Sequence, residues 1–320
     1  MPDLPRGPRT LLLLAFASVW FVWGSTFLVI RYAIDGIPPI LMCGIRLLAA
    51  GLVLLVWARV SGQPWPRGVE WRNAILVGLL LPGIGNASVT LGVAHVPSGL
   101  VALLVSTIPL WMGLFASLGR NAEPPAPRAE LGLAMGFAGI TLLIGPGLIT
   151  GHDAALSPLW ALVPIAGSLS WAWGSLWSRR TRLPASPLVS TGAGLAAAGV
   201  GLLLLAAGIG DFSHWNPAAV PTTAWLSLAY LAAFGSVLGF SAYLYLLRHV
   251  APEVVATYAF VNPIVAMFVG FIFAGETLTP RTLTAAAVVL VAVLLIVTAP
   301  LSRRAAAAPA GAGAMPARRP

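Results

Sequence analysis

The chain contains two similar stretches, AHVPSGLVALLVSTIPLW at residues 94–111 and RHVAPEVVATYAFVNPIV at residues 248–265. The two copies pair His95 with His249, Ala102 with Ala256 and Pro109 with Pro263. A second repeated motif lies near the start of each half, where WxxWGS at Trp20–Ser25 resembles WAWGS at Trp171–Ser175. Both motifs recur after about 150 residues, so the sequence predicts two similar halves.

Apolar runs of membrane-spanning length surround these copies. A helix needs roughly 20 apolar residues to cross a hydrocarbon core of about 30 Å. Ten runs approach that length, and the connectors between them are short and rich in Pro, Gly, Asp, Asn and Arg. The runs are Leu11–Ile30, Ile37–Ala58, Ala74–Ala94, Gly99–Ser117, Leu131–Leu148, Leu159–Trp177, Leu188–Ile209, Trp225–Leu247, Val254–Ala274 and Leu283–Ala299.

The predicted fold class is all-α and integral to the membrane, with ten transmembrane helices. Helices are expected because backbone groups must be satisfied inside lipid, and these runs lack the alternation of barrel strands. The predicted organisation is a cytoplasmic tail (1–9), a first five-helix repeat (10–149), a second five-helix repeat (158–300) and a disordered cytoplasmic tail (301–320).

Composition excludes several classes of protein. Hydrophobic residues make up 58% of the chain and charged residues only 8%, whereas soluble domains carry about 25% charged residues. The formal charge of +9 comes from 18 basic residues, all arginine and scattered between apolar runs, so the lipid bilayer and not nucleic acid is the expected partner.

Cys43 is the only cysteine. No nucleotide-binding loop, metal cluster or nucleophile constellation is recognisable, so neither cofactor, metal nor enzymatic activity is expected.

The arginine distribution predicts the orientation. With the N-terminus inside, the cytoplasmic segments hold fifteen arginines, and the opposite side holds two, Arg31 and Arg281. The start of the chain superficially fits a cleaved signal peptide, but its apolar run continues to Ile30 and favours a retained helix. We therefore expect an inner (plasma) membrane protein with both termini cytoplasmic. Because five is odd, the two repeats should lie inverted relative to one another, an architecture of secondary transporters.

Four stretches carry a family resemblance: WGSTFLVIR (23–31), GIRLLAAGLVLL (44–55), VPSGLVALLVSTIPLW (96–111) and VAPEVVATYAFVNPIVAMFVGFIFAGETLT (250–279). Together they resemble the drug/metabolite transporter superfamily, specifically its EamA-type members, from about Leu11 to Ala299. This resemblance implies ten helices in two homologous five-helix domains. The chain departs from the family after its fourth helix, where LGRNAEPP with a displaced Glu123 stands in place of a Gly-Glu pair like Gly275-Glu276.

Arg46 is the sharpest candidate for a binding residue, because it lies nine residues after Ile37 in the second predicted helix. A charge at mid-helix costs at least about 2.5–3.5 kcal/mol unless it faces a cavity or a partner, and the predicted helices contain no acid to pair with it. Two interpretations are open: Arg46 binds an anionic group such as a substrate carboxylate, or it is a structural arginine that bonds backbone carbonyls.

Other polar and aromatic side chains could line the same site. These candidates are Trp23, Ser25, Thr26, Asn86, Trp173, Ser175, Tyr258 and Asn262. Aromatic walls with a few polar groups suit a small-molecule pocket. The alternatives are interfacial anchoring for the tryptophans and interhelical hydrogen bonding for the polar groups. Pro109 and Pro263 should kink their helices. Glu276 should have a role at a helix end or, alternatively, in proton coupling.

The predicted function is secondary transport of a small organic metabolite by alternating access, with the cavity between the repeats. An amino acid or another carboxylate-bearing compound is the favoured substrate class, and export is the favoured direction. The alternatives are a passive channel and a membrane-embedded enzyme. The Gly132 and Gly136 pair suggests either helix packing or contact within a homodimer.

Overall fold

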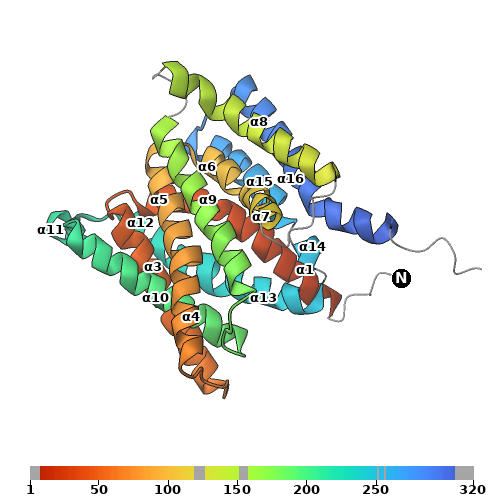
Figure 1. Cartoon of the computed structure of the whole chain (residues 1–320). Helices are drawn as coiled ribbons and strands as arrows, with labels where there is room; N and C mark the ends of the chain where they lie inside the picture. The colour runs from red at the N-terminus through yellow and green to blue at the C-terminus, as the bar shows by residue number, and fades with distance from the viewer. Residues whose placement is uncertain (1–7, 119–126, 151–157, 251, 256, 307–320) are drawn as a thin grey trace, which may run out of the picture.

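The protein is an all-α membrane protein of ten spans. The computed structural model describes residues 8–118, 127–150, 158–250, 252–255 and 257–306, and within these ranges nine helices have the length and apolarity of a span, with Tyr258–Ala274 as a shorter tenth. Figure 1 shows the helices packed as one bundle.

Five predicted runs form the first half of the bundle. In chain order its spans are α1 (Arg9–Ala17) with η1 (Ser18–Val22) and α2 (Trp23–Ala33); α3 (Pro39–Val60); α4 (Val69–Gly78) with η2 (Leu79–Ile84) and α5 (Gly85–His95); α6 (Ser98–Val105) with α7 (Ile108–Ser117); and α8 (Pro127–Thr150).

The second half follows the same succession. Its spans are α9 (Pro158–Ser178); α10 (Pro187–Gly208); α12 (Thr222–Tyr230) with η4 (Leu231–Leu238) and α13 (Gly239–His249); α14 (Pro252–Val255) with α15 (Tyr258–Ala274); and α16 (Pro280–Ala306). Short α11 (Asp211–His214) and the turn η3 (Pro217–Ala219) connect α10 to α12. Helix α16 continues six residues past the predicted boundary at 300, and residues 307–320 of the predicted tail lie outside the described residues.

Two predicted helices are interrupted. The run Gly99–Ser117 breaks at Ser106 and Thr107, just before Pro109 at the start of α7. Because Pro109 has no backbone N–H, it cannot donate to the carbonyl of Val105, and the interruption lies between these two residues. The kink at Pro109 stays a prediction. The hydroxyls of Ser106 and Thr107 donate to the carbonyls of Leu103 and Leu104, at 2.7 and 2.5 Å. The run Val254–Ala274 is likewise divided into α14 and α15, and Pro263 lies inside α15, where its kink remains a prediction.

Three spans contain a π-helical segment that the sequence analysis did not anticipate. These segments are η1, η2 and η4. The α-helices that follow η2 and η4 correspond closely, because α13 begins and ends 154 residues after α5. Wide π turns leave carbonyls that side chains must satisfy, and such segments occur frequently at functional sites. Here Ser170 Oγ donates to the carbonyl of Leu80 at 2.9 Å, and Trp23 Nε1 donates to that of Gly235 at 3.0 Å.

The second and seventh spans, α3 and α10, pack against each other along their length. Their contacts run in opposite directions along the chain: Gly44 meets Leu203, Leu48 meets Gly199, Gly51 meets Ala196 and Leu55 meets Gly192. The two helices are therefore antiparallel. Glycine permits this close approach, since a β-carbon on Gly51 would lie 2.3 Å from the Ala196 nitrogen.

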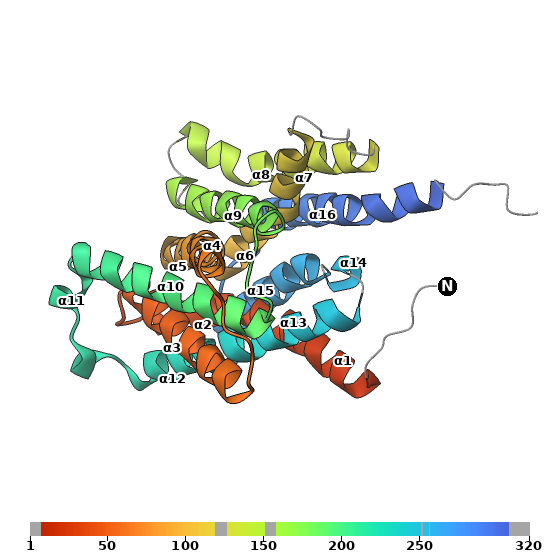
Figure 2. The same cartoon turned by 60° about the horizontal axis from the view of Figure 1, so that its bottom comes forward.

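Figure 2 shows α8 at one edge of the bundle with α9 and α16 next to it, α3 and α12 toward the other edge, and α5, α6 and α15 between them. The predicted small-residue pair faces inward in this arrangement. Gly132 contacts Ala292 and Ile296 of α16, and Gly136 contacts Leu110 of α7. Both glycines therefore serve packing within the chain.

Candidate functional site: a central cavity

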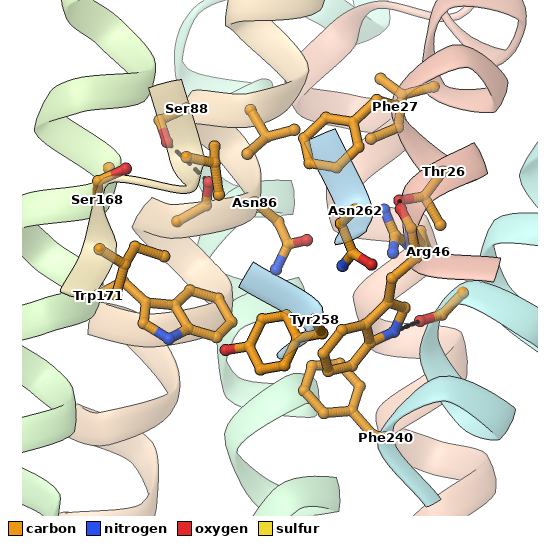
Figure 3. Close-up of a pocket in the computed structure, with 18 residues that line it drawn as sticks. Thr26, Phe27, Arg46, Asn86, Ser88, Ser168, Trp171, Phe240, Tyr258 and Asn262 are labelled. Atoms are coloured by element: carbon orange, nitrogen blue, oxygen red, sulfur yellow. Dashed lines mark hydrogen bonds between the residues drawn. The ribbon is translucent and has the colours of Figure 1, made fainter. Parts of the chain in front are cut away.

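A cavity of about 120 Å³ lies between the two predicted halves (Figure 3). This volume is several times the space that one water molecule needs, about 10–15 Å³. The first half contributes Trp23, Thr26, Phe27, Ile30, Arg46, Gly85, Asn86, Ser88, Val89, Val105 and Ile108. The second half contributes Gly167, Ser168, Trp171, Gly235, Phe240, Tyr258 and Asn262.

Arg46 supplies the charge in the wall of this cavity. It lies seven residues after Pro39 in α3, roughly 10 Å along the helix axis, and only 4% of it is exposed. Its Nε donates to Ser236 Oγ of η4 at 3.0 Å, while its buried Nη1 has no hydrogen-bond partner. Of the described residues that line the cavity, none is acidic. The guanidinium is thus anchored at one nitrogen, while another nitrogen is buried without a partner.

Neutral polar groups surround the guanidinium. Asn86 Nδ2 donates to the carbonyl of Pro82 at 2.9 Å, which fixes the amide and leaves its oxygen as an acceptor. Asn262, with its amide nitrogen turned toward η1, donates to the carbonyls of Trp20 and Val19 at 3.0 and 3.2 Å. The hydroxyl of Thr26 donates to its own helix, at the carbonyl of Trp23. These groups hold their positions through backbone contacts and can still accept hydrogen bonds from a ligand.

Aromatic side chains form the apolar part of the wall. Trp23 packs edge-to-face on Tyr258, with ring centroids 5.4 Å apart, and on Phe240, with centroids 5.6 Å apart. In the view of Figure 3, Trp171 and Arg46 lie on opposite sides, with Asn86 and Asn262 between them. The cavity therefore combines one charged group with an aromatic lining.

The structure brings six of the nine predicted binding residues to this cavity. They are Trp23, Thr26, Arg46, Asn86, Tyr258 and Asn262. Ser25, Trp173 and Ser175 are not among the lining residues. Ser25 Oγ instead lies 2.9 Å from Tyr230 Oη in a hydrogen bond, and Trp173 is 59% exposed on the outside of the bundle.

The placement of Trp173 corrects the alignment of the WGS motifs. Trp23 lies against Gly239, and the tryptophan in the corresponding position against Gly85 is Trp171. Gly85 and Gly239 are 154 residues apart, so the motif match at Trp173 was out of register by two positions. On a helix a shift of two residues turns a side chain by about 200°, from cavity to lipid.

Several lining residues were missed in the sequence analysis. Ser88 and Ser168 are buried hydroxyls, and Phe27, Trp171 and Phe240 complete the aromatic wall. Serines within apolar spans are visible in the sequence. Which face of each helix points inward is not visible, because the π-helical segments change the helical phase.

The family comparison agrees with this architecture. The EamA-like transporter family matches two segments, residues 10–145 and 158–298, which together form most of the chain. The chain belongs to the EamA-like transporter family. The resemblance to the drug/metabolite transporter superfamily is confirmed.

Curated relatives extend over most of this EamA-like chain. It is 37% identical over 271 residues to "Uncharacterized inner membrane transporter YedA" of Escherichia coli (strain K12), covering 83% of each chain. It is 27% identical to "Uncharacterized transporter YvbV" of Bacillus subtilis (strain 168), covering 96% of this chain and 97% of YvbV. It is 26% identical to the chloroplastic WAT1-related protein At3g02690 of Arabidopsis thaliana, covering 84% of this chain and 65% of the Arabidopsis protein. A solved crystal structure shares the fold with a TM-score of 0.58 at 20% identity, over 93% of this chain and 100% of its own.

These findings identify a multi-pass membrane protein of the EamA transporter kind and point to a transporter rather than an enzyme. Within the described ranges, no three His, Cys, Asp or Glu side chains gather in a way that could hold a metal ion.

Proposed function

We propose that this protein is a secondary transporter of small carboxylate-bearing metabolites, which it carries through the central cavity by alternating access. The observation that carries the proposal is the Nη1 atom of Arg46, which is buried in the cavity wall without a partner. An unpaired buried charge is costly, and a carboxylate forms charge-assisted hydrogen bonds with guanidinium. The aromatic residues of the lining, among them Trp171, Phe240 and Tyr258, suit an apolar body on the substrate.

Two features support an inverted repeat as the basis of alternating access. Equivalent helices α3 and α10 run antiparallel, and the π-helical segments η2 and η4 precede helices whose bounds are 154 residues apart. In such folds two similar halves exchange conformations around a central site. The names of the relatives and the arginine distribution support an inner membrane location with both termini in the cytoplasm.

Transport by the purified protein in liposomes tests the proposal. We expect saturable uptake of a set of small monocarboxylates, counterflow when the same compound is loaded inside, and little uptake of the matched primary amides, which lack the negative charge. Equal uptake of acids and amides would contradict the role of charge, and uptake without counterflow would indicate a channel. A metabolite screen of cells with and without the gene then identifies the natural substrate and the direction of flux.

Trp171 and Trp173, two residues apart in α9, provide a pair of substitutions that tests whether the aromatic wall binds the substrate. Trp171→Ala is expected to raise the half-saturating substrate concentration roughly tenfold, because burial of an apolar group against an indole contributes about 1.5 kcal/mol. Trp173→Ala is expected to leave it unchanged, since Trp173 faces away from the cavity and is 59% exposed. Uptake kinetics in liposomes measure both, and a larger effect at Trp173 would mean that the cavity is not the substrate site.

A further inference from the structure

A second cavity of about 560 Å³ lies beside the central one, toward the ends of the helices that the arginine count predicts to be outside. Its lining residues include Arg31, Tyr32, Asp35, Val93, His95 and Val96. The two cavities share helices: on α2, Ile30 lines the central cavity and Arg31 lines the outer one. On α5, Val89 lines the central cavity, and Val93, one helical turn further along, lines the outer one. A partition about one turn thick therefore separates them.

Glu276 lies at the edge of this partition and holds three partners from the other half of the chain. It follows α15, is 8% exposed, and accepts hydrogen bonds from the backbone nitrogens of Ser98 at 2.6 Å and Gly99 at 3.1 Å. Its Oε1 also lies 3.4 Å from Nη1 of Arg31. The first amides of a helix lack partners within the helix, and a carboxylate is favoured there by the helix dipole. Glu276 thus joins the second half to both α6 and α2.

Two glycines place this carboxylate. Gly275 adopts a left-handed conformation, with φ of 62°, which ends α15 and turns the next residue back toward α6. Gly270 leaves room for the side chain, because a β-carbon there would lie 2.5 Å from Glu276 Oε2. The position of the carboxylate is therefore determined by the local backbone.

The opposite face has a weaker contact between the same two halves. Glu70 lies 3.1 Å from Nε of Arg182, whose side chain is 79% exposed, and Asn73 Nδ2 donates to the Arg182 carbonyl at 3.0 Å. Solvent-exposed ion pairs contribute little, whereas buried charge-assisted bonds to backbone amides are about twice as strong as neutral ones. The outer contact is thus the stronger of the two.

We propose that Glu276 is a positioning residue that holds closed an outer gate between the central and outer cavities. Separation of the halves on this face requires the carboxylate to leave Ser98, Gly99 and Arg31 together. The outer cavity is then the mouth of the pathway, and the partition at Ile30 and Val89 is the gate. This inference rests on the proposed function, since it describes access to the same central site.

Thiol accessibility tests the gate without any substrate. The native cysteine is first removed by Cys43→Ser, and Val89→Cys then places a single thiol in the wall of the central cavity. A membrane-impermeant maleimide is applied to intact cells for the outer face and to inverted membrane vesicles for the inner face. We expect Glu276→Gln to raise the labelling rate from outside about tenfold and to lower it from inside, because charge-assisted bonds are lost. Mere loss of local packing would not produce this reciprocal change.

Glu70→Gln is the matched control, because it removes the corresponding carboxylate on the other face. It should not raise labelling from outside. A second variant, Ser98→Pro, removes the amide donor while leaving the helix intact: Ser98 is the first residue of α6, and Pro97 has the extended ψ of 138° that a following proline requires. It should change labelling in the same direction, and it provides the test if Glu276→Gln does not fold.

Unchanged outer labelling in both variants would overturn the gate, even if carboxylate transport is demonstrated. Conversely, if labelling responds but no carboxylate is transported, the gate stands and the proposed substrate class fails.

Discussion

Replacement of Arg46 by methionine is expected to lower the transport efficiency for carboxylates by at least about 100-fold, the largest functional effect that we expect from a single side chain. Methionine keeps much of the length but removes the charge and the free Nη1 donor. A carboxylate in the cavity would then be buried without a partner, and truncating one member of a buried charge pair costs about 2–5 kcal/mol. Arg46→Lys should give an intermediate loss, because it retains the charge without the planar fork.

The measurement is uptake kinetics in liposomes together with thermal unfolding of the purified protein. Arg46→Met should not lower the unfolding temperature, because the substitution removes a buried charge for which the lining residues offer no acid. Arg59→Met is the matched control, since Arg59 lies at the exposed end of the same helix. If Arg46→Met retained the transport kinetics of the native protein, Arg46 would be a structural arginine, as the alternative interpretation holds.

Gly199→Leu is expected to prevent folding, the largest effect on stability. A β-carbon at Gly199 would lie 2.4 Å from the backbone nitrogen of Leu48. Backbone atoms cannot move aside as side chains can, so α3 and α10 would have to separate along their whole contact. Overpacking commonly costs about 1–3 kcal/mol, and this substitution adds four carbons at a backbone contact, which places it above that range.

Gly208→Leu provides the control on the same helix. Apart from its chain neighbours and the backbone of its own helix, no residue lies within 4 Å of the β-carbon position of Gly208, which is near lipid-exposed Leu204 and Leu205. The yield of monodisperse protein in size-exclusion chromatography should fall to near zero for Gly199→Leu and remain close to native for Gly208→Leu. Similar yields of the two variants would show that the α3–α10 contact does not govern folding.

Much of the fold follows from patterns that depend on few competing interactions. The hydrophobic runs predicted the ten spans because a bilayer imposes both length and apolarity on each of them. Prolines occupy the first position of α3, α10 and α16, at Pro39, Pro187 and Pro280, where the missing amide costs nothing. Arg46 was identifiable because a lone charge in an apolar run is costly unless it faces a cavity or a partner.

The errors arose where helical phase mattered. Trp173 and Trp171 are two residues apart, and only the contact with Gly85 distinguishes which one faces the cavity. The π-helical segments were not anticipated, because their wide turns depend on side chains such as Ser170 and Trp23 that arrive from other helices. The role of Glu276 was undecided for the same reason, since its partner amides belong to residues 98 and 99.

The class of this protein, a ten-helix membrane bundle of the EamA kind with one deeply placed arginine, follows from the apolar runs and the motifs of the chain. Those properties are local, because each span is a consequence of its own composition and of the surrounding lipid. The packing of the helices sets which side chains line the central cavity, how a second cavity lies beside it, and that Glu276 joins the two halves. These properties depend on contacts between residues as much as 245 positions apart, and helix rotation and packing set such contacts rather than composition.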